Sequence, residues 1–194
     1  MLEYSITLAT WCTLTRLLLI PFLVLSIMKS YWAWAIIIFC IAATTDFLDG
    51  YIARKRNECT VVGAVLDAFT DKIFIMATLL SLALKPCHHL LIPNWLLGLC
   101  IVKEIVQIIG SLFLIMYGYV DALKPTILGK VCMTVQIAFV LWVLVGPFLV
   151  NPTILLLIHN YIIGIVALIT GICFIHYAIL ALYVLLRPTH KELK

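Results

Sequence analysis

Six long runs of apolar residues constrain the fold of this chain more than any other feature. A helix that crosses a lipid bilayer needs about 20 mostly apolar residues to span the hydrocarbon layer. Each run meets this requirement, so we expect an all-α, polytopic membrane protein built as a bundle of six transmembrane helices. The expected helices cover approximately residues 6–28, 31–53, 64–84, 91–117, 131–150 and 161–186.

The composition excludes several other classes of protein. Hydrophobic residues make up 65% of the 194 residues and charged residues only 11%, whereas soluble domains average about 45–50% and about 25%. So few charges cannot cover the surface of a soluble domain, and a disordered chain would be less apolar. The net charge of +4 is too small for a basic domain that binds nucleic acid. We find no internal repeat or linker and expect one membrane domain over residues 1–194.

Positively charged residues orient the expected bundle, because cytoplasmic loops carry an excess of Lys and Arg. If the N-terminus lies in the cytoplasm, the opposite side carries only Lys29 and Lys85. The N-terminus has neither the basic stretch nor the cleavage site of a signal peptide. We therefore expect the first apolar run to remain uncleaved, as a transmembrane helix. We therefore predict a multi-pass protein of a cell (inner) membrane, with both termini and the active site on the cytoplasmic side.

Ionisable residues interrupt the second apolar run near its end. On a helix, Asp46, Asp49, Gly50, Ala53 and Arg54 share one face, since residues three and four positions apart are neighbours. A charged side chain at membrane depth costs about 2.5–3.5 kcal/mol on insertion scales. Residues retained at such a cost are expected to be functional.

A second acidic face opens the third apolar run. Gly63, Asp67 and Asp71 fall at successive turns of a helix. The intervening residues 55–62 are long enough to turn the chain. The two acidic faces are therefore expected to meet at the cytoplasmic membrane surface.

Four carboxylates in one place repel one another unless positive charge lies between them. Hard divalent cations prefer carboxylate oxygen ligands, and neither face carries the His or Cys typical of zinc or copper sites. Two Mg²⁺ or Mn²⁺ ions suit four Asp residues and phosphoryl chemistry. Arg54 can bind a phosphate, and Gly50 leaves room for a ligand. Two alternatives are a patch of interhelical ion pairs and the ion or proton pathway of a transporter.

Residues 46–71 resemble the signature of the CDP-alcohol phosphatidyltransferase family, D-x2-D-G-x2-A-R-x8-G-x3-D-x3-D. Every fixed position matches. The segment from Thr13 to Arg16, with Pro21, also looks like the family's opening N-x2-T-x2-R-x4-P, although Thr10 stands in place of the Asn. The resemblance implies a six-helix membrane bundle that transfers a phosphatidyl group from CDP-diacylglycerol to an alcohol and releases CMP. It also implies a homodimer, for which Gly164 and Gly171 would allow close helix contact.

The resemblance also implies roles for individual residues. Asp71 would act as the general base that deprotonates the acceptor hydroxyl. The implied ligands of the two Mg²⁺ or Mn²⁺ ions are Asp46, Asp49, Asp67 and Asp71. The residues that would hold the CDP moiety are Gly50, Arg54 and Thr60.

The acceptor alcohol is less constrained. The chain is similar to one branch of the family that uses glycerol 3-phosphate, giving phosphatidylglycerophosphate, and to another that uses phosphatidylglycerol, giving cardiolipin. Gly129-Lys130 resembles the first branch and Lys124-Pro125-Thr126 the second. We expect glycerol 3-phosphate, with phosphatidylglycerol as the alternative. The candidates for a basic cradle around the acceptor phosphate are Lys103, Lys124, Lys130 and Arg16, although Lys103 can instead pair with Glu104.

Overall fold

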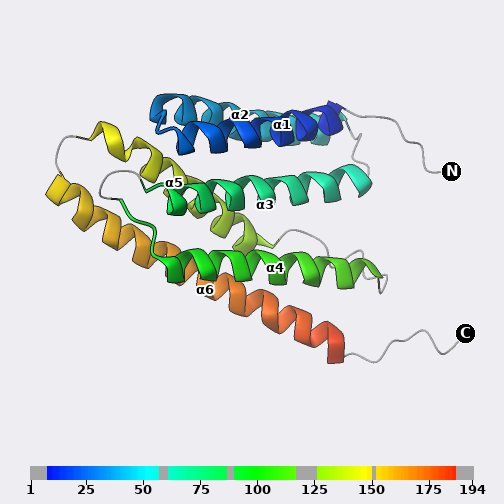
Figure 1. The fold of residues 1–194 in the computed structure, drawn as a ribbon. Helices are drawn as coiled ribbons and strands as arrows, with labels where there is room; N and C mark the ends of the chain where they lie inside the picture. Colours follow the sequence, from blue (N-terminus) through cyan, green and yellow to red (C-terminus); the bar gives the residue numbers. More distant parts are fainter. Residues whose placement is uncertain (1–7, 57–60, 87–89, 117–125, 150–151, 187–194) are drawn as a thin grey trace, which may run out of the picture. The chain divides into compact units, whose positions relative to one another are not determined.

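One helix overlaps each of the six apolar runs. A computed structural model describes residues 8–56, 61–86, 90–116, 126–149 and 152–186, with side chains described over 14–45, 69–86, 90–110, 126–149, 153–180 and at 182. Every regular element in these ranges is helical, which confirms the predicted all-α class (Figure 1). The elements are α1 (Leu8–Met28), α2 (Trp32–Arg56), α3 (Val61–Leu84), α4 (Asn94–Met116), α5 (Ile127–Val145), η2 (Gly146–Phe148) and α6 (Pro152–Leu186).

The last helix begins earlier than predicted. We expected it to start near residue 161, but α6 begins at Pro152. A proline is well accommodated in the first helical turn, because the N–H that it lacks would have no partner within the helix. Pro152 is therefore compatible with the first position of α6.

The chain divides into two compact units. The first comprises Met1–Ile92 and Val140–Leu155, and the second comprises Pro93–Phe139 and Leu156–Lys194. The first unit thus contains α1, α2 and α3 with short parts of α5 and α6. The second contains α4 and the larger parts of α5 and α6.

In the first unit, α1 packs against both α2 and α3. Its buried residues Arg16, Leu23 and Ile27 recur at helical spacing and form one stripe. A short turn at Ser30 connects α1 to α2. Ser30 adopts a left-handed backbone conformation with φ of 60°, and the Tyr31 N–H donates to the Ser26 carbonyl at 2.9 Å. This hydrogen-bonding pattern ends α1 and reverses the chain within a few residues.

In the second unit, each helix contributes a buried stripe that includes polar residues. On α4 the stripe contains Leu96, Cys100 and Lys103. On α5 it contains Cys132, Gln136 and Phe139. The stripe of α6 recurs at helical spacing and consists of His159, Ile163, Val166, Thr170 and Cys173. The ring of His159 stacks on Phe139, with centroids 6.1 Å apart, so α5 and α6 pack directly.

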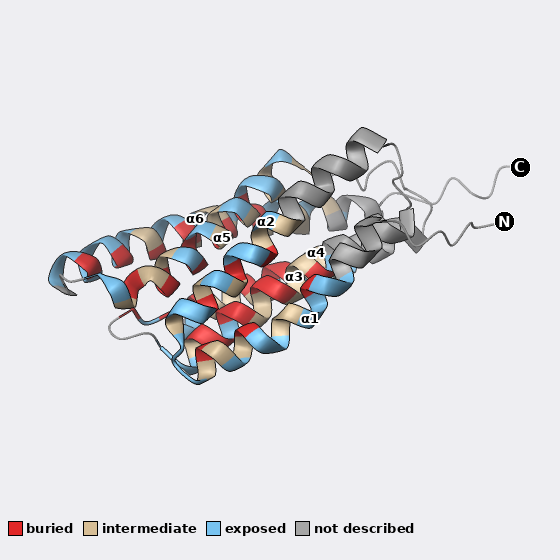
Figure 2. Ribbon diagram, turned by 90° about the horizontal axis from the view of Figure 1, so that it is seen from above, coloured by how far each residue is buried: buried red, intermediate tan, exposed pale blue. Residues whose placement is uncertain are grey.

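Within the part of the chain that the structure describes, two helical segments are long and apolar enough to cross a membrane. They cover Ile127–Phe148 and Thr153–Leu180, with mean hydropathies of 2.1 and 2.4. Exposed apolar residues recur over the described part of α6, among them Leu157, Leu168 and Ile179. Figure 2 shows exposed stretches of this helix in pale blue. Soluble monomers rarely expose so continuous an apolar surface. These helices therefore have the properties of a membrane protein.

The stack between Phe39 and Phe74 provides a test of the packing in the first unit. Phe39 is fully buried and Phe22 is exposed. Phe39→Ala should lower the free energy of unfolding by about 3 kcal/mol, because it leaves a cavity beside Phe74. Phe22→Ala is the matched control and should change it by less than about 0.5 kcal/mol. Unfolding in detergent, followed by circular dichroism during a dodecyl sulfate titration, measures both values. Equal losses in the two variants would contradict this packing.

Candidate active site

Both acidic segments are helical, as predicted. The first lies near the end of α2 and the second in the first half of α3. Asp71 is the one predicted metal ligand whose side chain lies within the described residues. The side chains of Asp46, Asp49, Arg54 and Asp67 lie outside the described set, the surroundings of Gly50 are likewise outside it, and Thr60 lies outside the described residues altogether.

The acidic positions of α2 fall on the same helix face as its buried residues. Ala35, Phe39 and Ala42 are buried at helical spacing. The same spacing, continued along α2, reaches Asp46 and Asp49. The apolar contact that buries the first part of α2 therefore shares its helix face with the acidic positions.

The acidic positions of α3 share a face with its buried residues in the same way. Asp67, Asp71, Phe74 and Thr78 recur at helical spacing, and Phe74 and Thr78 are buried. The rings of Phe39 and Phe74 stack with centroids 5.4 Å apart. The faces through which α2 and α3 touch at this stack are thus the faces that carry the acidic positions.

Asp71 forms an ion pair with Arg16 of α1. The Arg16 Nη1 donates to the Asp71 Oδ1. The Arg16 side chain is 3% exposed and that of Asp71 is 17% exposed. A buried guanidinium needs an anionic partner because burial removes its hydration. Arg16 therefore neutralises one of the four acids predicted to bind metal.

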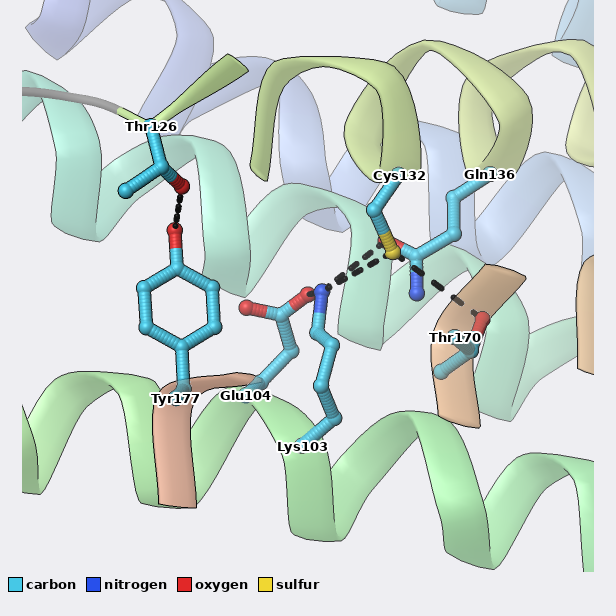
Figure 3. A network of polar contacts seen from close by, with 7 residues as sticks. All are labelled: Lys103, Glu104, Thr126, Cys132, Gln136, Thr170 and Tyr177. Atoms are coloured by element: carbon cyan, nitrogen blue, oxygen red, sulfur yellow. Dashed lines mark hydrogen bonds and ion pairs between the residues drawn. The ribbon is translucent and has the colours of Figure 1, made fainter. Parts of the chain in front are cut away.

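Lys103 lies at the centre of a polar network in the second unit (Figure 3). Its ammonium pairs with the carboxylate of Glu104, the next residue on α4. It also donates to Gln136 Oε1 at 3.4 Å and to Cys132 Sγ at 3.8 Å, both on α5. The Cys132 thiol in turn lies 4.0 Å from Thr170 Oγ1 on α6. The network therefore connects α4, α5 and α6 through buried groups.

No motif in the sequence marks Cys132 or Thr170 for a role in such a network. Both are small residues in apolar helices, where such residues usually pack without specific partners. The signal that identifies them is their position in the buried stripes that face Lys103. The buried Lys103 ammonium needs hydrogen-bond acceptors around it. Its burial therefore accounts for polar residues in the stripes of α5 and α6 that face it.

A contact between α5 and α6 lies near the start of α5. The Tyr177 hydroxyl is 3.0 Å from Thr126 Oγ1, and the Thr126 hydroxyl accepts the N–H of Gly129 at 3.2 Å. A Cβ atom at Gly129 would meet the Tyr177 hydroxyl. Gly129 is thus required for the close approach of Tyr177. Its neighbour Lys130 is exposed, and Lys124 lies outside the described residues.

The described residues contain no group of three or more His, Cys, Asp or Glu side chains that would hold a metal ion. Three of the four predicted ligands have side chains outside this set. The metal site therefore stays a prediction.

Comparison with known proteins identifies relatives over most of the chain. The profile of the CDP-alcohol phosphatidyltransferase family matches residues 6–186. A protein of Salmonella choleraesuis is 34% identical over 146 residues, which cover 71% of this chain and 76% of the relative. A protein of Escherichia coli K12 is 33% identical over 145 residues, with the same coverage. A protein of Aquifex aeolicus is 35% identical over 120 residues, and this match covers 61% of the chain and 64% of the relative's length. All three relatives are named CDP-diacylglycerol–glycerol-3-phosphate 3-phosphatidyltransferase.

The pair between Lys103 and Glu104 predicts a non-additive effect on stability. Lys103→Met or Glu104→Gln alone should lower the free energy of unfolding by about 3–5 kcal/mol, because each leaves a buried charge without its counter-ion. The double variant should lose clearly less than the sum. Lys130→Met removes an exposed charge and should change stability by less than about 0.5 kcal/mol. Unfolding in detergent measures all four variants, and additive losses would contradict a buried pair.

The close approach at Gly129 predicts a rescue. Gly129→Ala should lower the free energy of unfolding by about 1–3 kcal/mol, because the new methyl group displaces the Tyr177 hydroxyl. Combining it with Tyr177→Phe removes that hydroxyl and should recover part of the loss. Gly98 is the control, since a Cβ atom there meets no atom within 4 Å. Gly98→Ala should leave stability unchanged or raise it by up to about 1 kcal/mol. A double variant less stable than Gly129→Ala would refute this explanation.

Proposed function

Since the chain belongs to the CDP-alcohol phosphatidyltransferase family, we propose that it transfers a phosphatidyl group from CDP-diacylglycerol to glycerol 3-phosphate, giving phosphatidylglycerophosphate and CMP. The observation that carries this proposal is the match to relatives named for that reaction, which extends over 71% of the chain at 33–34% identity. The match of all eight fixed residues of the signature supports the membership of the family and hence the transfer from a CDP-linked donor.

In the proposed reaction, an acceptor hydroxyl oxygen attacks the phosphorus of the phosphatidyl group. The bond between this phosphorus and the oxygen that bridges to CMP breaks, and CMP leaves with the electron pair of that bond. Asp71 takes the proton of the attacking hydroxyl as the general base. Its partly exposed carboxylate on α3 supports this role, because a base must reach its substrate.

The four acids fit two divalent cations by the chemistry of their donors. Asp46, Asp49, Asp67 and Asp71 offer only carboxylate oxygens, the ligands that Mg²⁺ and Mn²⁺ prefer. Asp71 pairs with the Arg16 guanidinium, so its carboxylate lies where a cation can approach it. When bound, two such ions would neutralise the diphosphate and the charge that develops in the transition state.

The nucleotide part of the donor is assigned to α2. Gly50 and Arg54 lie one turn apart, so a phosphate bound by Arg54 can approach the helix backbone at Gly50. Thr60 completes this part of the proposal. For the acceptor phosphate, burial favours the exposed Lys130 over Lys103 and Arg16, whose charged groups are buried and paired. Lys124 stays a candidate on its sequence position alone.

The proposal places the reaction in a cell inner membrane. Six helices span the bilayer as one domain over residues 1–194, with both termini and the acidic site on the cytoplasmic side. The positive-charge bias of the loops supports this orientation. A homodimer is part of the proposal, and the open space beside Gly164 and Gly171 on α6 is compatible with it.

The test of the proposal is the release of CMP by the purified protein in detergent. CDP-diacylglycerol and Mg²⁺ are fixed, and the acceptor is glycerol 3-phosphate, phosphatidylglycerol, inositol phosphate or serine. We expect turnover with glycerol 3-phosphate alone. Turnover with phosphatidylglycerol alone would make the protein a cardiolipin-forming enzyme and overturn the proposed acceptor. The absence of CMP with every acceptor, in a folded protein supplied with metal, would favour a transporter.

Asp71→Asn is the control for this assay. It keeps the shape of the side chain but removes the base, so CMP release should fall by about 10²–10⁴-fold. Removal of Mg²⁺ with a chelator should abolish turnover by the unaltered protein. Wild-type rates in either case would contradict the assigned chemistry.

A further inference from the structure

Arg16 is a buried cation of the first unit. The proposed reaction does not assign it a role. Binding a soluble acceptor requires a charged group that the acceptor can reach. The Arg16 side chain is 3% exposed, and its guanidinium already pairs with Asp71. Arg16 is therefore poorly suited to hold a phosphate that enters and leaves with each turnover.

The packing of α1 fixes the position of Arg16. It shares a buried stripe with Leu23 and Ile27, and α1 packs against both α2 and α3. A guanidinium held on a packed helix has few other positions available. Its partner on α3 is consequently held in one orientation.

The ion pair occupies one oxygen of Asp71. The contact joins Arg16 Nη1 to Asp71 Oδ1, while the Asp71 side chain retains partial exposure. One oxygen is thus anchored by α1, and the carboxylate can still present its other oxygen to a substrate. Because the Arg16 guanidinium contacts Asp71, its positive charge also repels a divalent cation that approaches the same carboxylate.

We propose that Arg16 is a positioning residue that anchors Asp71 through Oδ1 and, as its counter-ion, weakens the binding of divalent metal there. This inference rests on the proposed function for the role of Asp71 as base. The anchor keeps Asp71 oriented toward the acceptor hydroxyl. The repulsion keeps its carboxylate from being drawn fully onto the metal.

The test compares Arg16→Gln, Arg16→Lys and the control Lys29→Gln, which removes an exposed positive charge just after α1. The first readout is Mn²⁺ affinity without substrate, measured by electron paramagnetic resonance on the detergent-solubilised protein. Arg16→Gln should bind Mn²⁺ about tenfold more tightly, because a repelling charge is removed. Arg16→Lys keeps the charge and should stay close to the unaltered protein, as should Lys29→Gln.

The second readout is the kinetics of CMP release. Arg16→Gln should lower kcat about 10²-fold, because a base displaced by about 1 Å loses that much rate, while the KM for glycerol 3-phosphate stays within twofold. Arg16→Lys should recover part of kcat, since it restores a single point charge without the planar fork. Tighter metal binding with slower turnover is a combination that a merely structural residue would not produce.

Three results would overturn the inference. A rise in the KM for glycerol 3-phosphate with unchanged Mn²⁺ affinity would make Arg16 an acceptor ligand. Weaker Mn²⁺ binding together with a lower unfolding temperature would make its role structural. If Arg16→Gln does not fold, a folded Arg16→Lys whose Mn²⁺ affinity departs clearly from that of the unaltered protein would refute the counter-ion role. Should the unaltered protein turn over no acceptor, the proposed function fails, whereas the Mn²⁺ measurement still tests the counter-ion role.

Discussion

A charge buried among apolar helices requires an opposite charge beside it, and the described structure depends on this constraint. The ion pair between Arg16 and Asp71 satisfies it in the first unit. The pair connects α1 to α3 in the first unit. Lys103 and Glu104 satisfy the same constraint in the second unit. With only 11% charged residues, the chain places several of them where they must be paired, which restricts how its helices can pack.

The apolar contacts position the acidic segments rather than merely filling space. Phe39 and Phe74 stack between α2 and α3. Each lies on the helix face that carries the acidic positions of its own helix. A helix is rigid over a few turns, so the orientation fixed at the stack extends to Asp46 on α2 and to Asp71 on α3. The packing of ordinary aromatic side chains therefore sets the direction of the residues proposed to carry the chemistry.

Burial separates the basic residues into two groups with different roles. Arg16 and Lys103 are buried and engaged with carboxylates. Lys130 is exposed at the start of α5, close to the contact between Tyr177 and Gly129. A cation that holds its own helix bundle together is not available to a diffusing substrate, whereas an exposed one is. The proposed acceptor site therefore depends on the second group.

The sequence alone determined the helical class, the approximate helix positions and the acidic faces, because apolar runs and residue spacing are local properties of the chain. Its eight-residue signature also identified the family before any contact was known. Only the tertiary structure decided that Arg16 pairs with Asp71, that Lys103 is buried against Gln136, and that Tyr177 lies against Gly129. These contacts join residues on different helices, and local spacing does not specify which helix faces which.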